Sequence, residues 1–192
     1  MTSIHKAVDA AMRIQGWKTW GELAWMAKKA SEASLVIDVG CWRGRTTKAM
    51  AAVCPGKIVA VDHASGKYSG DTGRNAILDL VPPERIASDF MSNLSAEIGA
   101  GNVVPVFENG ICAIARVRGI LFGEKADFAW IDGDHGYEDV KRDILAYREM
   151  LKPGAMLSGH DYEDSFPGVQ RAVQELCPGF RRGLGTSWYV TV

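Results

Sequence analysis

Two short stretches of the sequence place ligand-type side chains directly after apolar runs. The run at 126–131 is followed by the letters DGDH, and the run at 155–158 is followed by GHD. The candidate site residues at these two points are Asp132, His135, His160 and Asp161. Carboxylates are hard oxygen ligands, and an imidazole is both a metal ligand and a proton acceptor near neutral pH. The two stretches therefore predict one site, assembled from two places in the chain.

The residue types indicate separate roles within this set. His135 is the candidate general base, because an imidazole changes its protonation near neutral pH. The candidate metal ligands are Asp132, His160 and Asp161. A plainer interpretation is that Asp134 and His135 only cap a helix starting near Gly136, and we prefer this interpretation for Asp134. For the four site residues, clustering at two strand ends favours a function.

Strands and helices alternate along the rest of the chain. Apolar runs at 35–39, 57–61, 103–107, 126–131 and 155–158 predict five strands, and 180–184 and 188–192 predict an antiparallel hairpin. Helices are expected near 46–53, 89–98, 111–121 and 169–176. This alternation predicts an α/β domain with a doubly wound, largely parallel sheet. Ligands of such sheets bind at the carboxyl ends of the strands, where the candidate residues lie.

One further helix is expected between the fourth and fifth strands. Val140, Ile144, Tyr147 and Leu151 share one helical face, and the LysProGly stretch at 152–154 should end that helix. The glycine-rich stretch at 63–74 is expected to form a mobile loop.

The N-terminal part of the chain predicts a helical extension. We expect a single domain, in which residues 1–32 form this extension and residues 33–192 form a Rossmann-like core. Apolar residues recur at helical spacing on both sides of a break near Gly16. Three tryptophans crowd this region: Trp17, Trp20 and Trp25. They are expected to pack the helices onto the domain, and a partner surface or substrate lid is the alternative.

The first two strands end in residues that suit a nucleoside ligand. The first is followed by CWRGRTT, with Gly40 and Gly44 marking a tight turn into a helix whose free N–H groups suit an anion. Asp62 ends the second strand, 22 residues after Gly40, and could accept hydrogen bonds from a ribose diol. A solvated Asp at a strand end is the alternative. Asn109, after the third strand, could contact an adenine edge or equally cap the next helix.

Composition narrows the class of protein. The chain has 192 residues, 47% of them hydrophobic, which suits one globular domain with a sizeable core. A net charge of -1 gives no reason to expect binding to nucleic acid or to an anionic membrane. The four cysteines form no CxxC pair, and no signal peptide or membrane-span pattern occurs. We therefore predict a cytoplasmic protein, with its oligomeric state left open.

Taken together, these motifs resemble class I S-adenosylmethionine-dependent methyltransferases. Within that class the resemblance is to the branch containing macrolide-sugar O-methyltransferases and cephalosporin-hydroxylase-like proteins. The motifs that carry it are DVGCWRGRTT, the acid in IVAVD, WIDGDHGYEDVKRDI, LKPG, and SGHDY followed by PGVQRAV. They cover about residues 34–177. The combination of IDGDH, LKPG and GHDY is specific, whereas the glycine turn alone is not.

The resemblance implies a fold, a cofactor and a set of binding residues. The fold would be a seven-stranded Rossmann-like sheet, mostly parallel with an antiparallel last strand. The cofactor would be S-adenosylmethionine, with its methionine part near Gly40, its ribose at Asp62 and its adenine near Asn109. The implied cofactor-binding residues are Asp38, Gly40, Trp42, Gly44, Thr46, Asp62, Asn109 and Asp132.

The resemblance also implies a divalent metal, usually magnesium, bound by acids that end the fourth and fifth strands. Asp132 and Asp161 match those positions, but His160 stands where the family has the first acid of a pair. Magnesium prefers oxygen ligands, whereas manganese, iron or zinc tolerates imidazole better. A site without metal is the alternative. His135 matches the position of a proposed base in some relatives.

The expected activity is methylation of a hydroxyl on a small molecule or sugar, with a metal as a possible aid. The base would take the hydroxyl proton while the oxygen attacks the sulfonium methyl group in line. One alternative is a cofactor-binding or regulatory protein that has lost catalysis. Another is an NAD-dependent enzyme, against which the absence of a GxGxxG motif counts.

Overall fold

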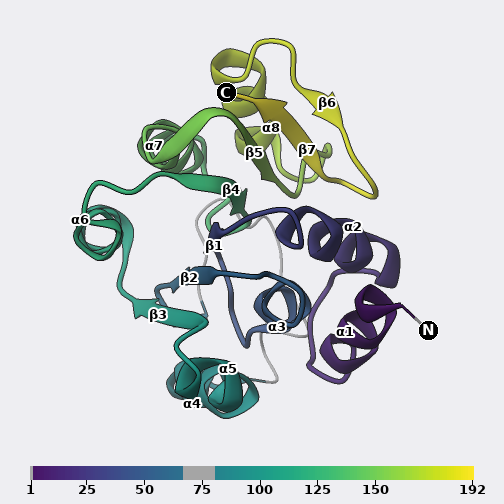
Figure 1. Ribbon diagram of the computed structural model, residues 1–192. Coiled ribbons are helices and arrows are strands. Elements are labelled where there is room, and N and C mark those ends of the chain that lie inside the picture. The colour runs from purple at the N-terminus through teal and green to yellow at the C-terminus, as the bar shows by residue number, and fades with distance from the viewer. Residues whose placement is uncertain (1, 67–80) are drawn as a thin grey trace.

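The computed structural model describes residues 2–66 and 81–192. In this part of the chain one seven-stranded sheet runs in the order β3-β2-β1-β4-β5-β7-β6 (Figure 1). The strands are β1 Leu35–Val39, β2 Lys57–Asp62, β3 Val103–Phe107, β4 Ala126–Ile131, β5 Leu151–Gly159, β6 Arg181–Arg182 and β7 Trp188–Thr191. Strands β1 to β5 pair in parallel, and β7 runs antiparallel to both β5 and β6. The predicted mostly parallel sheet with an antiparallel last strand is confirmed.

Helices cover both faces of the sheet. They are α1 Ser3–Ala11, α2 Trp20–Ala30, α3 Arg45–Ala51, α4 Pro83–Asn93, α5 Ser95–Gly99, α6 Gly110–Leu121, α7 Tyr137–Arg148 and α8 Pro167–Leu176. Helices α6, α7 and α8 pack one apolar cluster against the sheet, and α2, α3 and α4 pack a second one on the opposite face (Figure 1). The strands are buried from both sides, as continuous apolar runs in a parallel sheet predict.

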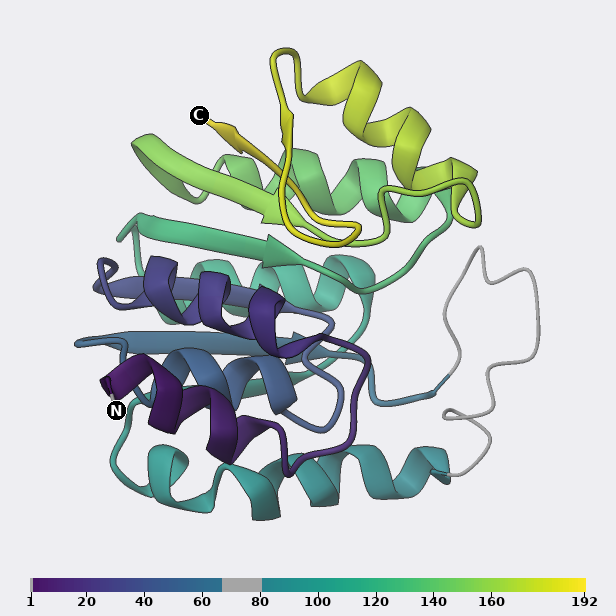
Figure 2. The same cartoon turned by 90° about the vertical axis from the view of Figure 1, so that its right-hand side faces the viewer.

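The N-terminal extension is packed onto the second face through α3. Val8 and Ala11 of α1 and Leu23 and Ala27 of α2 are buried together with Ala49 of α3. Figure 2 shows that the connection between α1 and α2 lies at the edge of the sheet to which the parallel strands point. The extension therefore brings residues 12–19 to the edge where ligands bind in such folds.

Two expected elements have wrong boundaries. The helix expected near 89–98 begins at Pro83 and is divided at Leu94 into α4 and α5. The other difference lies between α7 and β5. Helix α7 ends at Arg148, and β5 begins at Leu151, so Leu151 belongs to the strand and the LysProGly stretch continues it. The pairing of β4 with β5 explains the difference, because Leu151 pairs with Ala126 before the register shifts to Met156 beside Phe128. The local sequence of residues 151–154 is typical of a helix end, but pairing with the neighbouring strand gives these residues an extended conformation.

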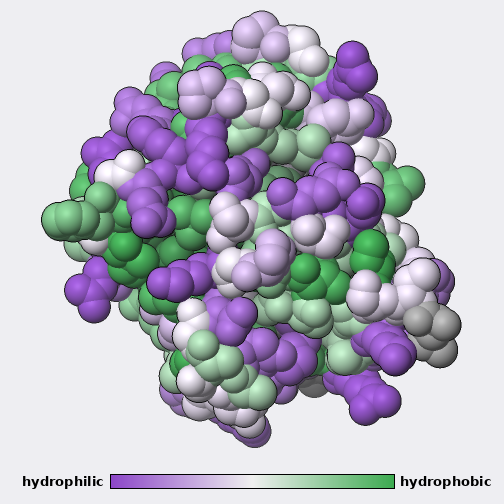
Figure 3. Space-filling model, in the orientation of Figure 1, coloured by the Kyte–Doolittle hydropathy of each residue, from purple (hydrophilic) through white to green (hydrophobic). Residues whose placement is uncertain are grey.

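Most of the glycine-rich loop expected at 63–74 lies outside the described residues. Among the helices of the described residues, none has the length and apolar content that crossing a bilayer requires. All four cysteines are free thiols. Figure 3 shows hydrophobic residues interspersed with hydrophilic ones on the face turned toward the viewer.

One carboxylate anchors the starts of three strands. Asp127 of β4 accepts hydrogen bonds from the backbone N–H of Ser34 at 2.8 Å and of Leu35 at 3.0 Å, and from Lys152 Nζ of β5 at 2.5 Å. Burial raises the pKa of Asp127, but these hydrogen bonds outweigh burial and lower the pKa to about 2. The ionised carboxylate is therefore the form that the folded state stabilises.

We expect Asp127→Asn to lower the free energy of unfolding by about 2 kcal/mol at pH 7. The folded-state pKa lies below the unfolded value, so this stabilisation is present above about pH 4 and is lost as the pH falls toward 2. Urea unfolding of both proteins between pH 7 and pH 3 measures the difference. A difference that stays constant over this range would show that the carboxylate charge contributes nothing.

Candidate functional site

A cavity of about 490 Å³ opens at the carboxyl edge of the sheet. Its walls come from the connection between α1 and α2, the turn after β1, and the segments after β4 and β5. The residues predicted for the site that line it are Gly40, Trp42, Thr46, Asp132, His135, His160 and Asp161. The two strand ends that carry ligand-type residues thus meet in one place, as predicted.

The turn after β1 is built on a glycine. Gly40 has a φ of +82°, and a Cβ placed there would lie 1.9 Å from the carbonyl oxygen of Asp132. Glycine is required because the backbone after β4 passes directly over this position. Gly44 has a φ of +89° and is the N-cap of α3, where a Cβ would lie 2.3 Å from Leu94. The turn therefore packs against the backbone of Asp132 through Gly40 and begins α3 at Gly44.

Asp38 lies behind the cavity wall. Its side chain is fully buried, and Oδ2 accepts a 2.6 Å hydrogen bond from the hydroxyl of Thr47. Burial is the main reason why its pKa rises to about 7. Asp38 therefore holds α3 through its hydrogen bond with Thr47, and it is not among the residues that line the cavity.

A second, narrow crevice of about 30 Å³ adjoins the main cavity, and both are lined by Gly40 and Gly133. Asp62 and Asn109 line the crevice together. Asp62 accepts hydrogen bonds from the backbone N–H of Trp42 at 2.8 Å and of Ala64 at 2.6 Å, and burial raises its pKa. Asn109 is the N-cap of α6, but its side chain makes no capping hydrogen bond.

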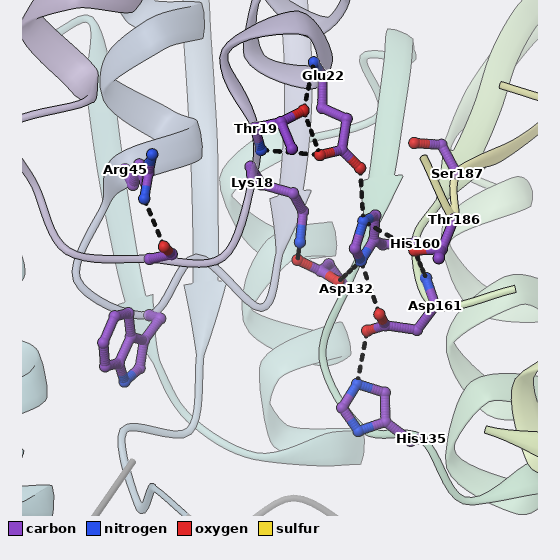
Figure 4. A network of polar contacts seen from close by, with 12 residues as sticks. Lys18, Thr19, Glu22, Arg45, Asp132, His135, His160, Asp161, Thr186 and Ser187 are labelled. Atoms are coloured by element: carbon purple, nitrogen blue, oxygen red, sulfur yellow. Dashed lines mark hydrogen bonds and ion pairs between the residues drawn. The ribbon is translucent and has the colours of Figure 1, made fainter. Parts of the chain in front are cut away.

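The cavity contains a network of charged side chains (Figure 4). Lys18 Nζ lies 2.5 Å from Asp132 Oδ2, and His160 Nε2 lies 2.8 Å from Glu22 Oε1. On its other side, His160 Nδ1 lies 2.8 Å from Asp161 Oδ1 and 3.5 Å from Asp132 Oδ1. The Nδ1 contacts have ion-pair distances but not the direction of a hydrogen bond. Cations and carboxylates alternate through the network.

The imidazole of His160 is held in its charged form. Burial lowers its pKa, and so does the ammonium of Lys18. The contacts with Asp161 and Glu22 and the charge of Asp132 outweigh both effects and raise the pKa to about 9. In turn, the partners of Glu22, mainly His160 and Thr19, overcome the effect of burial and lower the pKa of Glu22 to about 2. Glu22 and His160 are therefore both charged at neutral pH.

The three predicted metal ligands meet the geometric condition for a metal site but not the electrostatic one. Atoms of Asp132, His160 and Asp161 lie within 4.8 Å of one another, as ligands of one ion must. However, Asp132 already pairs with the ammonium of Lys18, and His160 already contacts Glu22 through Nε2 and Asp161 through Nδ1. Metal ligands must be deprotonated, and a nearby cation repels a dication. The donor set in its present surroundings does not fit a divalent metal.

His135 points into the cavity from the segment after β4. Its Nε2 lies 2.9 Å from Asp161 Oδ2, and its ring packs on Phe166 at 4.3 Å between centroids. The backbone behind it is fixed by Gly168, whose Cβ, if present, would lie 2.4 Å from the carbonyl oxygen of His135. A carboxylate that holds one imidazole nitrogen orients the ring, as in other acid–histidine pairs.

The N-cap position of α7 is occupied by Gly136, which has no side chain that could cap the helix. Asp134 and His135 precede this position by two residues and by one residue. Asp134 lines the narrow crevice, on the side of Asp62 and Asn109.

Several residues of the cavity were not predicted from the sequence. They include Lys18, Glu22, Phe166 and Thr186. Trp17 also lines the cavity, and its ring lies 4.5 Å from that of Trp42 between centroids, in a tilted arrangement. Trp25 packs on Phe128 and Trp130 as expected. The TWGE letters do carry a capping-box signal, and Thr19 and Glu22 form that box. The signal predicts the start of α2, not that Glu22 would reach His160.

Solved structures of low sequence identity share this fold. An O-methyltransferase from Bacillus cereus, solved with SAH, superposes with a TM-score of 0.67 at 14% identity and covers 100% of this chain and 92% of that chain. TomG from Streptomyces achromogenes, an O-methyltransferase of tomaymycin synthesis solved with SAM, gives 0.65 at 14% identity, with 100% and 90% covered. The calicheamicin methyltransferase CalS11 gives 0.67 at 17% identity, with 88% and 76% covered. At these identities the likeness establishes the fold alone.

A comparison with curated protein sequences found no match. The model of a family described as "Methyltransferase domain" matches residues 37–162, well over half of the chain. The match spans the turn after β1, the ends of β2 and β3, and the DGDH and GHD stretches. It leaves the NAD-dependent alternative without support. The chain belongs to this methyltransferase-domain family.

Proposed function

We propose that this protein transfers the methyl group of S-adenosylmethionine to a hydroxyl of a small molecule, with His135 as the base. The observation that carries the proposal is the His135–Asp161 pair, which faces a cavity beside the Gly40 turn. The names of the similar structures support it, because several are O-methyltransferases and two of these were solved with SAH or SAM.

We assign the two adjoining cavities to the two ends of the cofactor. In this proposal the nucleoside occupies the crevice of Asp62 and Asn109, and the methionine part lies along Gly40, Trp42 and the start of α3. The sulfonium group would then lie near Gly40 and Gly133, which line both spaces. A crevice of about 30 Å³ is smaller than a nucleoside, so its walls must move apart when the cofactor binds.

The reaction requires only the groups that line the cavity. The acceptor oxygen attacks the methyl carbon, the carbon–sulfur bond breaks, and the electron pair of that bond stays on sulfur in S-adenosylhomocysteine. The hydroxyl proton passes to His135, whose neutral ring, when it donates through Nε2 to Asp161, is basic at Nδ1. We leave a divalent cation out of this scheme because Asp132 is already paired with the ammonium of Lys18 and His160 already bridges Glu22 and Asp161.

The acceptor belongs to the class of small hydroxylated molecules. The main cavity of about 490 Å³ has the size of a small-molecule site. Its walls combine aromatic rings, from Trp17, Trp42 and Phe166, with charged groups that can hold hydroxyls. A sugar or a diol fits this mixture. One similar structure is named as a TDP-rhamnose 3'-O-methyltransferase, which supports a sugar as the first class to try.

Calorimetry and a turnover assay together test the proposal. We expect one S-adenosylhomocysteine to bind per chain and NAD not to bind. With S-adenosylmethionine and a panel of nucleotide sugars, free sugars and diols, we expect at least one acceptor to release S-adenosylhomocysteine. Binding without turnover on any acceptor would favour the regulatory alternative, and no binding would refute the proposal.

The nucleoside placement predicts a specific loss of affinity in Asp62→Asn. The amide keeps an acceptor oxygen for one of the two backbone N–H groups that Asp62 binds, those of Trp42 and Ala64, and it lacks the charge that a ribose diol would contact. We expect S-adenosylhomocysteine to bind about 10-fold to 100-fold more weakly, as loss of a charged hydrogen-bond partner predicts. Titration calorimetry measures this change. Asp9→Asn, on the exposed part of α1, is the matched control and should bind as the wild type does. Equal affinity in Asp62→Asn would mean that the ribose lies elsewhere.

A further inference from the structure

We infer that the ammonium of Lys18 occupies the place of the divalent cation that the family resemblance implies, so that this site works without a metal ion. The inference deepens the proposed function and rests on it for the identity of the oxygen that Lys18 would contact. The claim about the metal stands on the arrangement of side chains alone.

Lys18 is built into the site rather than passing near it. Its Nζ lies 2.5 Å from Asp132 Oδ2, although the two residues are 114 positions apart in the sequence. The side chain is 5% exposed, and that of Asp132 is 13% exposed. Because both side chains are buried, the packing around them restricts the ion pair to one geometry, whereas a surface pair joins mobile side chains.

The segment that carries Lys18 has its own anchors. Gly16, Trp17, Lys18 and Thr19 all line the cavity, so the connection between α1 and α2 forms one of its walls. The carbonyl oxygen of Gly16 accepts a hydrogen bond from the guanidinium of Arg45, in α3. Directly after Lys18, Thr19 and Glu22 form the capping box of α2. Anchors on both sides of Lys18 direct its side chain toward Asp132.

The other members of the metal-like trio are also engaged. His160 bridges two carboxylates, with Nε2 at 2.8 Å from Glu22 and Nδ1 at 2.8 Å from Asp161. Glu22 in turn accepts two hydrogen bonds from Thr19, at 2.8 Å and 2.7 Å. A dication entering between Asp132 and Asp161 would have to displace Lys18 and separate His160 from its partners. The chain thus supplies the positive charge that a metal would bring.

The ammonium can also do the work of positioning the acceptor. Lys has three N–H donors, and one of them goes to Asp132. A donor directed into the cavity can hold an acceptor oxygen and stabilise the negative charge that grows on it as the proton leaves. Lys18 is therefore a positioning residue, beside Asp132, for a proton transfer that His135 completes.

Binding of Mn²⁺ tests the inference without an activity assay. The protein is treated with chelator, dialysed and titrated with Mn²⁺. Binding is followed by electron paramagnetic resonance and by the melting temperature. We expect the wild type to bind no stoichiometric Mn²⁺ and to melt at the same temperature in EDTA and in Mn²⁺. One Mn²⁺ bound per chain, or a melting temperature that falls in EDTA, would overturn the inference.

Lys18→Met removes the ammonium and keeps most of the side-chain volume. We expect this variant to gain one Mn²⁺ site and to melt several degrees higher in about 1 mM Mn²⁺ than in EDTA, since a ligand of the folded state stabilises it. Lys28→Met, at an exposed lysine of α2 that pairs with Glu32, is the control and should resemble the wild type. If Lys18→Met binds no Mn²⁺ and its melting temperature does not change with Mn²⁺, the ammonium is not the group that excludes the ion.

The outcome is separable from that of the proposed function. If no hydroxyl acceptor is ever methylated but Mn²⁺ binding follows the expected pattern, the proposed reaction fails and the metal inference stands. If an acceptor is methylated and wild-type activity is lost in EDTA and restored by Mn²⁺, the proposed reaction stands and the inference fails.

Discussion

His135→Asn is expected to lower kcat by about 10²-fold to 10⁴-fold, the usual range for loss of a general base. The affinity for S-adenosylhomocysteine should stay near the wild-type value, because the predicted cofactor contacts lie at Gly40, Asp62 and Asn109. Initial rates with the best acceptor and titration calorimetry measure the two quantities. A selective fall in kcat is the signature of a group that acts in the transition state.

The choice of Asn separates proton transfer from shape. Asn fills part of the same space and can still donate to Asp161, but it cannot accept a proton at neutral pH. Wild-type activity should rise with pH as the imidazole loses its proton. The pH–activity profile of the variant should lack this rise. His5→Asn, at an exposed histidine of α1, is the matched control. Normal turnover by His135→Asn would assign the proton to another group or to solvent.

Gly40→Ala is expected to destabilise the fold by more than about 4 kcal/mol, a size reserved for a few specific mechanisms. The new Cβ would lie 1.9 Å from the carbonyl oxygen of Asp132, so one of the two backbone segments must move. The φ of +82° adds a cost of about 1 kcal/mol for a residue with a side chain. Moving the segment after β4 would also pull Asp132 away from Lys18.

Gly123→Ala is the control that isolates the clash. Gly123 has a φ of +90°, but no atom lies within 4 Å of the Cβ position. It should therefore lose only about 1 kcal/mol, from the left-handed backbone. Chemical unfolding of the three proteins gives the comparison. Equal losses in the two variants would mean that the approach of Asp132 to the turn contributes nothing.

Local sequence patterns determined the elements of this fold, because apolar periodicity and glycine or proline positions act over a few residues. The strands β1 to β5 and the terminal hairpin lie where their apolar runs predicted them. The failure at Leu151 shows the boundary of such reasoning. Its helical spacing was real, but pairing with Ala126 on the neighbouring strand decided its conformation.

The sequence also determined which strand ends would meet. Strands β4 and β5 pair in parallel, so their carboxyl ends lie side by side, and Asp132 and His135 had to come near His160 and Asp161. That consequence follows from sheet topology, which the alternation of strands and helices already implies. The convergence of the predicted trio is confirmed.

Only the tertiary structure decided which partners surround Asp132, His160 and Asp161. Lys18 and Glu22 come from the N-terminal helices, 114 and 138 residues away from Asp132 and His160. Their arrival depends on the packing of α1 and α2 against α3, which leaves no short motif in the sequence. The charge state of a carboxylate or an imidazole depends on the cations and anions within a few ångströms of it. The same residue types therefore read as a metal site in the sequence and fold into a closed network of ion pairs.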